Sequence, residues 1–297
     1  MSTKPPVSVV TGANSGIGRA IAIHLASKGH DVYGTVRDVQ RAGKLQNMAA
    51  EAGVEVRLVT LDVADDDSVA QGMAEILERA GQVDVLVNNA GIGANAVVED
   101  ATPADFLDAM NVNLCGAVRC LRAVLPGMRE RRSGSIVNIT SVTGRFGAIA
   151  QAPYTASKWA FEGLSEQLAF ELAPFGIRVV IVEPGVTKSA IFAKNVDLPS
   201  TEVSGAYERQ YNRMLDFYAA GVANATDPFE VAAIVYEAVT TESPQLRYPC
   251  SWGGESILAG RATMSDQDWV SLGAEPDEEQ YRRRFQAAFG VDITPPA

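Results

Sequence analysis

The chain alternates short apolar runs with longer segments in which apolar residues recur at helical spacing. The short runs are rich in Val and Ile and are apolar on both faces, which is typical of strands buried in a parallel sheet. They predict strands, the last one only weakly patterned, at Val7–Thr11, Asp31–Val36, Val54–Leu61, Val83–Asn88, Gly134–Thr140, Arg178–Glu183 and Gln245–Tyr248. The longer segments predict helices at Gly16–Lys28, Val39–Ala52, Asp65–Ala80, Pro103–Arg131 and Tyr154–Ala173.

Strands that alternate with helices indicate an α/β fold. Because strand–helix–strand crossovers are right-handed, the pattern predicts an open, doubly wound parallel sheet with helices on both faces. No repeat or low-complexity linker interrupts it, so we expect one domain. After Pro184-Gly185 the pattern loosens. Residues 186–223 hold helix-like apolar positions without a strand, and the tail from Ser251 closes with a predicted helix at Asp277–Phe289.

Composition excludes several classes of partner. The net charge of −11, from 25 basic and 36 acidic residues, offers no basic surface for nucleic acid or an anionic membrane. No apolar run approaches the roughly 20 residues of a membrane span. Residues Met1–Pro6 are short and polar, so we expect no secretory leader and a cytoplasmic location.

The cysteines and histidines indicate neither a metal site nor a cysteine nucleophile. Cys115, Cys120 and Cys250 lack Cys-x-x-Cys spacing, which argues against a zinc site and against a disulfide framework. His24 and His30 flank one predicted helix and form no recognisable dyad with a cysteine. We therefore predict no metal site and no Cys/His mechanism.

A glycine-rich turn follows the first predicted strand and opens the first predicted helix. It reads Thr11-Gly12-Ala13-Asn14-Ser15-Gly16-Ile17-Gly18. Glycines let the backbone approach a pyrophosphate, and the helix N-terminus adds free N–H groups and the positive end of its dipole. We therefore expect a dinucleotide to contact Gly12, Asn14, Ser15, Gly16, Ile17 and Gly18.

This turn resembles that of the short-chain dehydrogenase/reductase family, Thr-Gly-x-x-x-Gly-x-Gly, and differs from that of the extended members such as the nucleotide-sugar epimerases. Further motifs agree in order over about residues 7–190. The resemblance implies a Rossmann-like fold that binds a nicotinamide cofactor. It assigns further cofactor contacts to Asp62 and Val63 at the adenine, to Asn89, Ala90 and Gly91 after the fourth strand, and to Pro184, Gly185 and Thr187 near the nicotinamide.

Ser141, Tyr154 and Lys158 form a candidate catalytic set. Tyr154 and Lys158 are four residues apart and so share a helix face. Ser141 follows a buried strand, where a doubly wound sheet places its ligands. A free tyrosine has a pKa near 10, so we expect the Lys158 ammonium and the positive oxidised nicotinamide to lower the pKa of Tyr154. Tyr154 would then act as acid in reduction and base in oxidation, while Ser141 polarises the carbonyl oxygen.

The family resemblance extends this set. Tyr-x-x-x-Lys occurs often by chance, but Ser141 stands thirteen residues before Tyr154, the spacing typical of the family. The resemblance also implies that Tyr154 and Lys158 contact the cofactor, Lys158 at the nicotinamide ribose. Asn113, within Asn111-Val112-Asn113, corresponds to an active-site asparagine that anchors a water in the proton relay.

The end of the second strand predicts the cofactor. An acidic residue there would bind the 2′-hydroxyl of NAD, but this chain has Val36 followed by Arg37. The missing carboxylate removes repulsion of a 2′-phosphate, and the Arg37 guanidinium can pair with it. Asp38 follows and either blunts this effect or caps the next helix. We predict that NADP(H) is preferred, with NAD(H) possible.

Apolar residues near the predicted catalytic mouth suggest a hydrophobic substrate. They lie at Phe146, Ile149, Ile191, Phe192, Val196, Leu198, Phe217 and Tyr218, with Arg145 among them. The stretch Asp31–Asp38 and the long C-terminal region resemble the 17β-hydroxysteroid and retinol dehydrogenase members. We therefore expect a ketone or aldehyde, interconverted with its alcohol, on a steroid, a retinoid or a similar body.

The chain is accordingly divided into residues 1–250, a dinucleotide-binding catalytic domain with a substrate lid at about 186–225, and residues 251–297, a C-terminal extension packed on the same domain. One alternative is a 3-oxoacyl carrier-protein reductase, although the charge of −11 does not favour docking of an acidic carrier. Another is an NADP(H)-sensing regulator without turnover. Family members pair through the helices corresponding to Pro103–Arg131 and Tyr154–Ala173, so we expect a homodimer or homotetramer.

Overall fold

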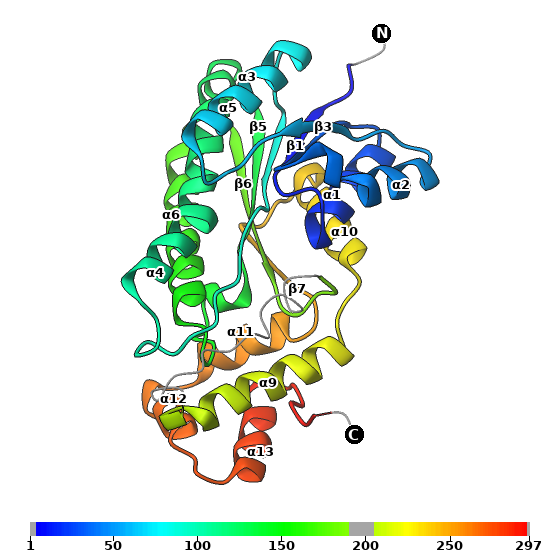
Figure 1. Cartoon of the computed structure of the whole chain (residues 1–297). Coiled ribbons are helices and arrows are strands. Elements are labelled where there is room, and N and C mark those ends of the chain that lie inside the picture. The colour runs from blue at the N-terminus through cyan, green and yellow to red at the C-terminus, as the bar shows by residue number, and fades with distance from the viewer. Residues whose placement is uncertain (1–3, 190–204, 296–297) are drawn as a thin grey trace.

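A parallel sheet runs through the computed structural model, which describes residues 4–189 and 205–295 (Figure 1). Its strands are ordered β3-β2-β1-β4-β5-β6-β7, and every neighbouring pair is parallel. Their bounds are β1 Val7–Val10, β2 Asp31–Val36, β3 Arg57–Thr60, β4 Val85–Asn88, β5 Gly134–Ile139, β6 Ile177–Pro184 and β7 Arg247–Cys250. The predicted doubly wound sheet is confirmed.

The strand order reverses beside β1. Val10 pairs with Gly34 of β2 on one side and with Val87 of β4 on the other. The chain therefore leaves β1 and β4 toward opposite halves of the sheet, and a crevice opens at their carboxyl ends. The candidate site motifs lie at or after the carboxyl ends of strands β1 to β6.

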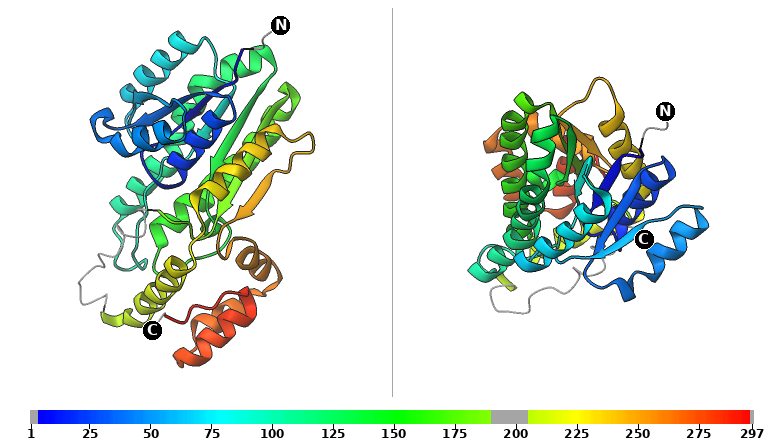
Figure 2. Two further views of the ribbon diagram at one scale, coloured as in Figure 1. Left: turned by 90° about the vertical axis from the view of Figure 1, so that its right-hand side faces the viewer. Right: turned by 90° about the horizontal axis from the view of Figure 1, so that it is seen from above.

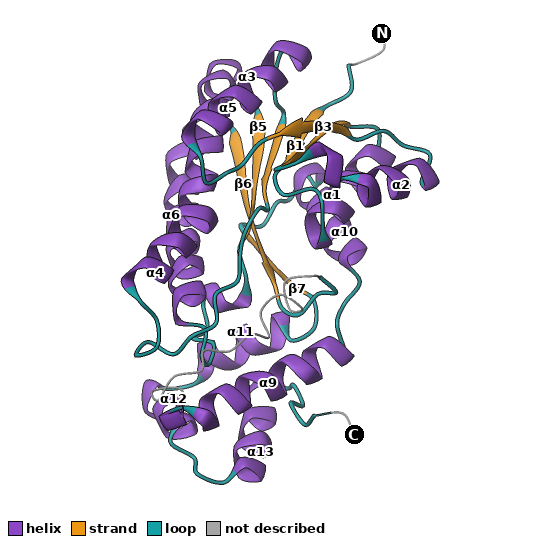
Figure 3. Ribbon diagram, in the orientation of Figure 1, coloured by secondary structure: helices purple, strands orange, loops and turns teal. Residues whose placement is uncertain are grey.

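Helices cover both faces of the sheet, as Figure 2 shows from two further views and Figure 3 shows with helices and strands coloured separately. One face carries α1 (Gly16–Ser27), α2 (Gly43–Glu51) and α10 (Pro228–Thr240); the other carries α3 (Asp66–Ala80), α5 (Gly116–Arg131) and α6 (Ala152–Leu172). Side chains alternate along each strand between the two cores. Val9 of β1 packs on the face with α3, and Val10 packs on the face with α1.

Local boundaries depart from the predictions in two helices. The segment Val39–Ala52 is divided into a 3₁₀ turn at Val39–Arg41 and helix α2. The segment Pro103–Arg131 stays helical throughout, but α4 (Pro103–Met110) and α5 are joined by a π-helical turn at Asn111–Cys115. Such turns recur at functional sites because they shift the residues that follow them around the helix.

The region after β6 is richer in structure than the sequence pattern suggested. Helix α9 (Glu208–Ala223) follows, and α10 begins at an Asp227-Pro228 cap that was not recognised. Pro at the first helical position after an Asp cap is a readable signal. The candidate lid residues Ile191, Phe192, Val196 and Leu198 lie outside the described residues.

The C-terminal segment forms α11 (Gly254–Thr263), α12 (Asp266–Gly273) and α13 (Glu278–Phe289), of which only the last was predicted. These helices lie beyond the carboxyl ends of the strands, beside α9 (Figure 1). The Arg213 guanidinium of α9 lies 2.9 Å from a Glu278 carboxylate oxygen of α13, and Asp216 pairs with Arg282 at 2.6 Å. The extension is thus fastened to the helix over the site, while its boundary at residue 250 stays a prediction.

No helix among residues 4–189 and 205–295 has both the length and the apolarity to cross a membrane.

Phe289 is the centre of an aromatic cluster that joins the extension to the loop after β5. Its ring centroid lies 5.3 Å from that of Phe146 and 4.7 Å from that of Phe285. We expect Phe289→Ala to lower the free energy of unfolding by about 3–5 kcal/mol, measured by urea denaturation. Val270→Ala on α12, where the side chain is 64% exposed, is the control and should change it by less than about 0.5 kcal/mol. Equal stability of both variants would mean that the extension unfolds separately from the core.

Candidate active site

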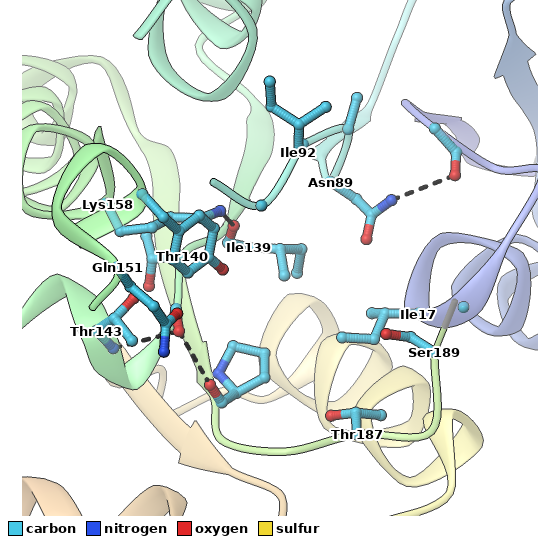
Figure 4. Close-up of a pocket in the computed structure, with 18 of the residues that line it drawn as sticks. Ile17, Asn89, Ile92, Ile139, Thr140, Thr143, Gln151, Lys158, Thr187 and Ser189 are labelled. Carbon is cyan, nitrogen blue, oxygen red and sulfur yellow. Dashed lines mark hydrogen bonds between the residues drawn. The ribbon is translucent and has the colours of Figure 1, made fainter. Parts of the chain in front are cut away.

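One large cavity lies at the carboxyl ends of the strands. It has a volume of about 1110 Å³, which exceeds the range of roughly 300–1,000 Å³ for a single drug-sized ligand. The glycine turn, the ends of β2, β4, β5 and β6, and helices α9 and α13 all contribute side chains to it. Figure 4 shows Thr143, Gln151 and Lys158 on one side of this cavity and Ile17 and Ser189 on the other. The cavity therefore has room for two ligands side by side.

The glycine turn is shaped so that side chains are excluded. Gly12 adopts φ +66° and Gly16 φ +51°, in the left-handed region. A Cβ at Gly18 would stand 2.3 Å from the Asn89 amide nitrogen. Ser15 precedes α1, and its hydroxyl makes no capping hydrogen bond to the described helix. The first N–H groups of α1 are therefore available, and this cradle fits the pyrophosphate of a dinucleotide.

Hydrogen bonds from the end of β4 hold this turn. The Asn89 side chain donates to the Thr11 carbonyl at 2.8 Å, and the Thr11 hydroxyl accepts from the N–H groups of Asn89 and Ala90 at 2.9 and 3.0 Å. Arg19 donates to the Asn14 carbonyl at 3.1 Å, so it supports the turn from within the helix. Gly12, Asn14, Ser15, Gly16, Ile17, Asn89, Ala90 and Gly91 all line the cavity, whereas Gly18 packs behind it.

The end of β2 presents two arginines to the cavity. Val36 is buried, and Arg37 is exposed without an ion pair among the described residues. Asp38 accepts a hydrogen bond from the Gln40 N–H at 2.9 Å and lies 3.5 Å from the guanidinium of Arg41. Asp38 thus caps the following turn and pairs with Arg41. Arg41, a second cation at the cavity, was missed because its approach depends on that 3₁₀ turn.

Asp62 and Val63 line the cavity beyond β3. The Asp62 carboxylate accepts from the Ala64 N–H at 3.0 Å, and the Asp62 N–H donates to the Ser68 hydroxyl at 2.9 Å. These bonds close a local turn that turns the chain from β3 into α3. Asp62 is therefore fixed in place by its own neighbours at the edge of the cavity.

Ser141, Tyr154 and Lys158 meet at the far side of the cavity from the glycine turn. The Ser141 hydroxyl accepts from the Thr143 N–H at 3.2 Å and faces the Pro184 carbonyl at 3.5 Å. The Lys158 ammonium donates to the Ile139 carbonyl at 3.0 Å and lies 5.7 Å from the centroid of the Tyr154 ring. The sequence spacing thus brings all three side chains into one cavity.

Burial dominates the ionisation of this set. It raises the pKa of the Tyr154 phenol above its ordinary value, while the hydroxyls of Ser141 and Thr143 act in the opposite direction. Burial also lowers the pKa of Lys158 to about 8, although the nearby carboxylate of Glu162 acts to raise it. In the protein alone, burial outweighs the hydroxyls of Ser141 and Thr143, and the expected lowering of the Tyr154 pKa beside the oxidised nicotinamide stays a prediction.

Asn113 is not among the residues that line the described cavity. It lies in the π-helical turn, buried, and its amide bonds the Ile92 N–H at 2.8 Å, the Ile92 carbonyl at 3.0 Å and the Ser157 hydroxyl at 2.9 Å. Its side chain therefore clamps the loop after β4 to helix α6. Its expected role as an anchor for a water of the proton relay stays a prediction.

The segment after β6 closes the cavity floor. Gly185 donates to the Cys250 carbonyl at 2.8 Å, and a Cβ there would stand 2.1 Å from the Trp252 carbonyl oxygen. The Thr187 hydroxyl lies 2.8 Å from that of Ser251. Pro184, Gly185 and Thr187 all line the cavity. Their contact with a nicotinamide stays a prediction.

Part of the lining was not identified from the sequence. Among these residues are Arg41, Thr143, Gln151, Arg213, Met214, Tyr281, Phe285 and Ile293. Thr143 could have been noticed two residues after Ser141, and Gln151 three before Tyr154. Those of α9 and α13 carry no local signal, because their approach to the cavity depends on how distant helices pack.

Behind Lys158 lies a buried pair of acids. Glu183 is fully buried, and one of its oxygens lies 3.4 Å from Arg145 and 4.0 Å from Arg247. Arg247 also pairs with the buried Glu162 at 3.2 Å. Burial, helped by the charge of Glu162, raises the pKa of Glu183 from 4.5 to about 7, against the two arginines. Folding therefore strengthens proton binding at Glu183.

This shift predicts a pH-dependent stability. The stabilisation that the protein gains by binding a proton at Glu183 is fully present below about pH 4.5 and is lost as the pH rises to about 7. A glutamine side chain at this position does not titrate, so only the wild type loses this contribution. We therefore expect the unfolding free energy of Glu183→Gln minus that of the wild type to rise by up to roughly 3 kcal/mol from pH 5 to pH 8, measured by urea denaturation. Glu166→Gln, which removes an exposed partner of Arg247, is the control and should show no such trend. A constant difference between Glu183→Gln and wild type would refute the buried-proton assignment.

Comparison with known proteins agrees with this geometry. The family model described as short chain dehydrogenase matches residues 6–198. The 3-ketodihydrosphingosine reductase of Bacteroides thetaiotaomicron is 36% identical and spans 82% of this chain and 87% of its own. Retinol dehydrogenase 8 of Bos taurus is 35% identical, over 83% of this chain and 82% of its own. The 17-beta-hydroxysteroid dehydrogenase type 1 of Mus musculus is 37% identical, over 82% and 73%.

Solved structures agree as well. A short-chain dehydrogenase from Streptomyces avermitilis is 36% identical, covers 93% of this chain and 100% of that chain, and superposes with a TM-score of 0.78. A metagenomic short-chain oxidoreductase in complex with NADP is 31% identical, over 83% and 97%, with a TM-score of 0.65.

Proposed function

Because the chain belongs to the short-chain dehydrogenase/reductase family, whose members are oxidoreductases acting on CH–OH groups, we propose that it interconverts a bulky hydrophobic ketone or aldehyde and its alcohol, with NADP(H) as the preferred cofactor. One observation carries the proposal. Ser141, Tyr154 and Lys158 share a single cavity with the glycine turn at one end and an apolar wall at the other.

Different residues around the cavity would bind different parts of a nicotinamide dinucleotide. The glycine turn Gly12–Gly18 would hold the pyrophosphate, and Asp62 and Val63 the adenine. Lys158 and Tyr154 would contact the nicotinamide ribose, and the backbone of Pro184–Thr187 the nicotinamide itself. When bound, the nicotinamide supplies or accepts a hydride at the carbonyl carbon.

Tyr154 manages the proton on the oxygen of the same group. In reduction its O–H bond breaks and a new O–H bond forms on the substrate oxygen; oxidation reverses the transfer. Ser141 donates a hydrogen bond to that oxygen as negative charge develops on it. Lys158 has a pKa of about 8, so it is mostly charged at neutral pH and favours the Tyr154 phenolate.

The apolar end of the cavity supports a large hydrophobic substrate. Its wall is built by Phe146, Ile149, Met214, Phe217, Phe285 and Ile293, drawn from the loop after β5, from α9 and from the C-terminal extension. Retinol, hydroxysteroids and ketodihydrosphingosine, which the names of the relatives mention, are all large, mostly apolar alcohols or ketones. A substrate of this chemistry would place its one polar group at Tyr154 and its body against this wall.

The preference for NADP(H) is supported by the charges at the end of β2. Asp38 lies against Arg41 and the next turn, so Arg37 keeps a free guanidinium among the described residues. A 2′-phosphate beside Arg37 and Arg41 would meet two cations, one of them already paired with Asp38. The buried Val36 stands in the place where NAD binders have an acid.

A homo-oligomer is also proposed. Leu107 on α4 and Trp159 and Phe170 on α6 are large apolar side chains that remain exposed, Phe170 to 81%. Trp159 and Phe170 are eleven residues apart and therefore share one face of α6. A second copy of the chain would cover this face, in keeping with the expected homodimer or homotetramer.

Replacing Arg37 tests the cofactor assignment without a substrate. We expect NADPH to bind at least about tenfold more tightly than NADH, and Arg37→Ala to remove most of this difference by weakening NADPH alone. The measurement is titration of nicotinamide fluorescence. Arg122→Ala, an exposed arginine outside the cavity, is the matched control. Tighter binding of NADH would overturn the preference, and binding of neither would overturn the cofactor proposal itself.

Replacing Tyr154 separates an enzyme from a cofactor-sensing regulator. We expect Tyr154→Phe to lower turnover of retinal or a 17-ketosteroid by about 100-fold or more, because it removes the proton donor. NADPH affinity should change by less than about tenfold, since the rest of the site is intact. Tyr236→Phe on α10, outside the cavity, should behave as wild type. Unchanged turnover in Tyr154→Phe would show that Tyr154 is not the acid.

A further inference from the structure

Thr143 carries a buried hydroxyl that the described protein does not use. The residue is 7% exposed, it lines the cavity, and its Oγ1 has no hydrogen-bond partner among the described residues. A buried hydroxyl without a partner costs stability, so folding alone does not account for it. Its position at the cavity points to a partner that forms during the reaction.

The turn that bears Thr143 is held rigidly against the helix of Tyr154. Ser141 caps the 3₁₀ turn Val142–Gly144 by accepting the Thr143 N–H. A Cβ at Gly144 would stand 2.7 Å from Cγ of Glu162 and 3.1 Å from the Lys158 carbonyl oxygen, both on α6. This close contact fixes the distance between Thr143 and the first turns of α6.

The hydroxyls of Ser141 and Thr143 are unequally engaged. The Ser141 oxygen already accepts a hydrogen bond, and its own proton faces the Pro184 carbonyl at 3.5 Å. Both hydroxyls lie near enough to the Tyr154 phenol to lower its pKa against the effect of burial. Thr143 is therefore the donor with the least competition for its proton.

We propose that Thr143 is a second hydroxyl of the catalytic set, a positioning residue that donates a hydrogen bond to the Tyr154 oxygen whenever that oxygen carries negative charge. The inference rests on the proposed role of Tyr154 as acid and base. When the Tyr154 O–H bond breaks and the proton moves to the substrate oxygen, negative charge remains on the phenolate. The Thr143 O–H bond stays intact throughout.

The burial of the site makes this hydrogen bond matter. Solvent does not reach the Thr143 oxygen, so water cannot take its place beside the phenolate. Hydrogen bonds to a charged oxygen are stronger than neutral ones, and a fixed donor in a dry site stabilises the charge without reorganising. The hydrogen bond therefore favours the phenolate over the neutral phenol, in the direction opposite to burial.

The test reads the protonation of Tyr154 directly. In protein labelled with ¹³C at tyrosine Cζ and saturated with NADP⁺, the Tyr154 resonance is identified by its absence from Tyr154→Phe. We expect Thr143→Val to raise the titration midpoint of this resonance by about one pH unit, a tenfold change in the ionisation constant. Thr143→Ser, which keeps the hydroxyl, should restore it.

Thr155 provides a matched control. Its hydroxyl is also buried and without a partner among the described residues, and it adjoins Tyr154 in the sequence, but it does not line the cavity. Thr155→Val should leave the titration midpoint unchanged. Both valine variants keep a β-branched side chain of similar shape and remove a hydroxyl that binds nothing, so both should unfold at no lower urea concentration than the wild type.

Turnover of retinal or a 17-ketosteroid gives a second readout. We expect Thr143→Val to lower kcat about tenfold with KM nearly unchanged, and to move the alkaline limit of reduction to higher pH. If Thr143→Val matches Thr155→Val in the titration, the role of Thr143 is overturned, whatever the turnover. Full turnover by Tyr154→Phe would overturn the proposed function itself. That outcome is separate from the titration, which tests Thr143 alone.

Discussion

A chain of buried amide and hydroxyl groups ties the glycine turn to the helix that bears Tyr154 and Lys158. At the turn, Asn89 bonds the Thr11 carbonyl. One residue earlier, the Asn88 amide donates to Asn138 of β5 at 2.9 Å, and Asn138 donates to Ser165 of α6 at 2.8 Å. A third bond joins Asn113 to Ser157, whose hydroxyl donates to the Tyr154 carbonyl at 2.7 Å. Strands β4 and β5 and helix α6 thus hold fixed positions relative to the turn.

This constraint explains why polar residues stand in a core of Val and Ile. A buried amide is costly unless it is hydrogen-bonded, so sliding α6 along the sheet would break several bonds at once. Apolar packing alone tolerates small shifts far better. The polar links therefore set the distance between the two ends of the cavity, whereas the apolar faces on either side of the sheet supply most of the stability. The Thr143 hydroxyl takes no part in these links, which leaves it available for the role proposed above.

Much of this arrangement could be predicted from the sequence because it rests on local spacing. Apolar runs predict the strands within a few residues. Ser141 is placed at the carboxyl edge because it directly follows a strand, and Tyr154 and Lys158 by their helical spacing and the family resemblance. The positions of Arg41 and Thr143 at the cavity could not be predicted, because each residue lies in a short 3₁₀ turn that produces no apolar periodicity. The side-chain role of Asn113 depends on a π-helical turn hidden within a continuous helical pattern.

The C-terminal part of the cavity could not be predicted for a different reason. The contact of Phe146 with Phe289 joins residues more than 140 positions apart, and neither has a local pattern that names its partner. An aromatic side chain on an amphipathic helix gives the same sequence pattern whether it packs on a core or lines a substrate site. Only the packing of α9, α11 and α13 beyond the sheet distinguishes the two.

The ionisation of Tyr154 and Lys158 follows from the same packing. Burial disfavours the charged form of both side chains, so it moves the phenol pKa up and the ammonium pKa down, toward neutral forms of both. In the proposed reaction this bias is useful. Beside a neutral reduced nicotinamide, Tyr154 keeps the proton that reduction requires. Beside the positively charged oxidised ring it yields that proton more readily, as oxidation requires. A tyrosine that Lys158 alone had already ionised could serve only one of these directions, so the dominance of burial in the protein alone fits a residue that must act in both.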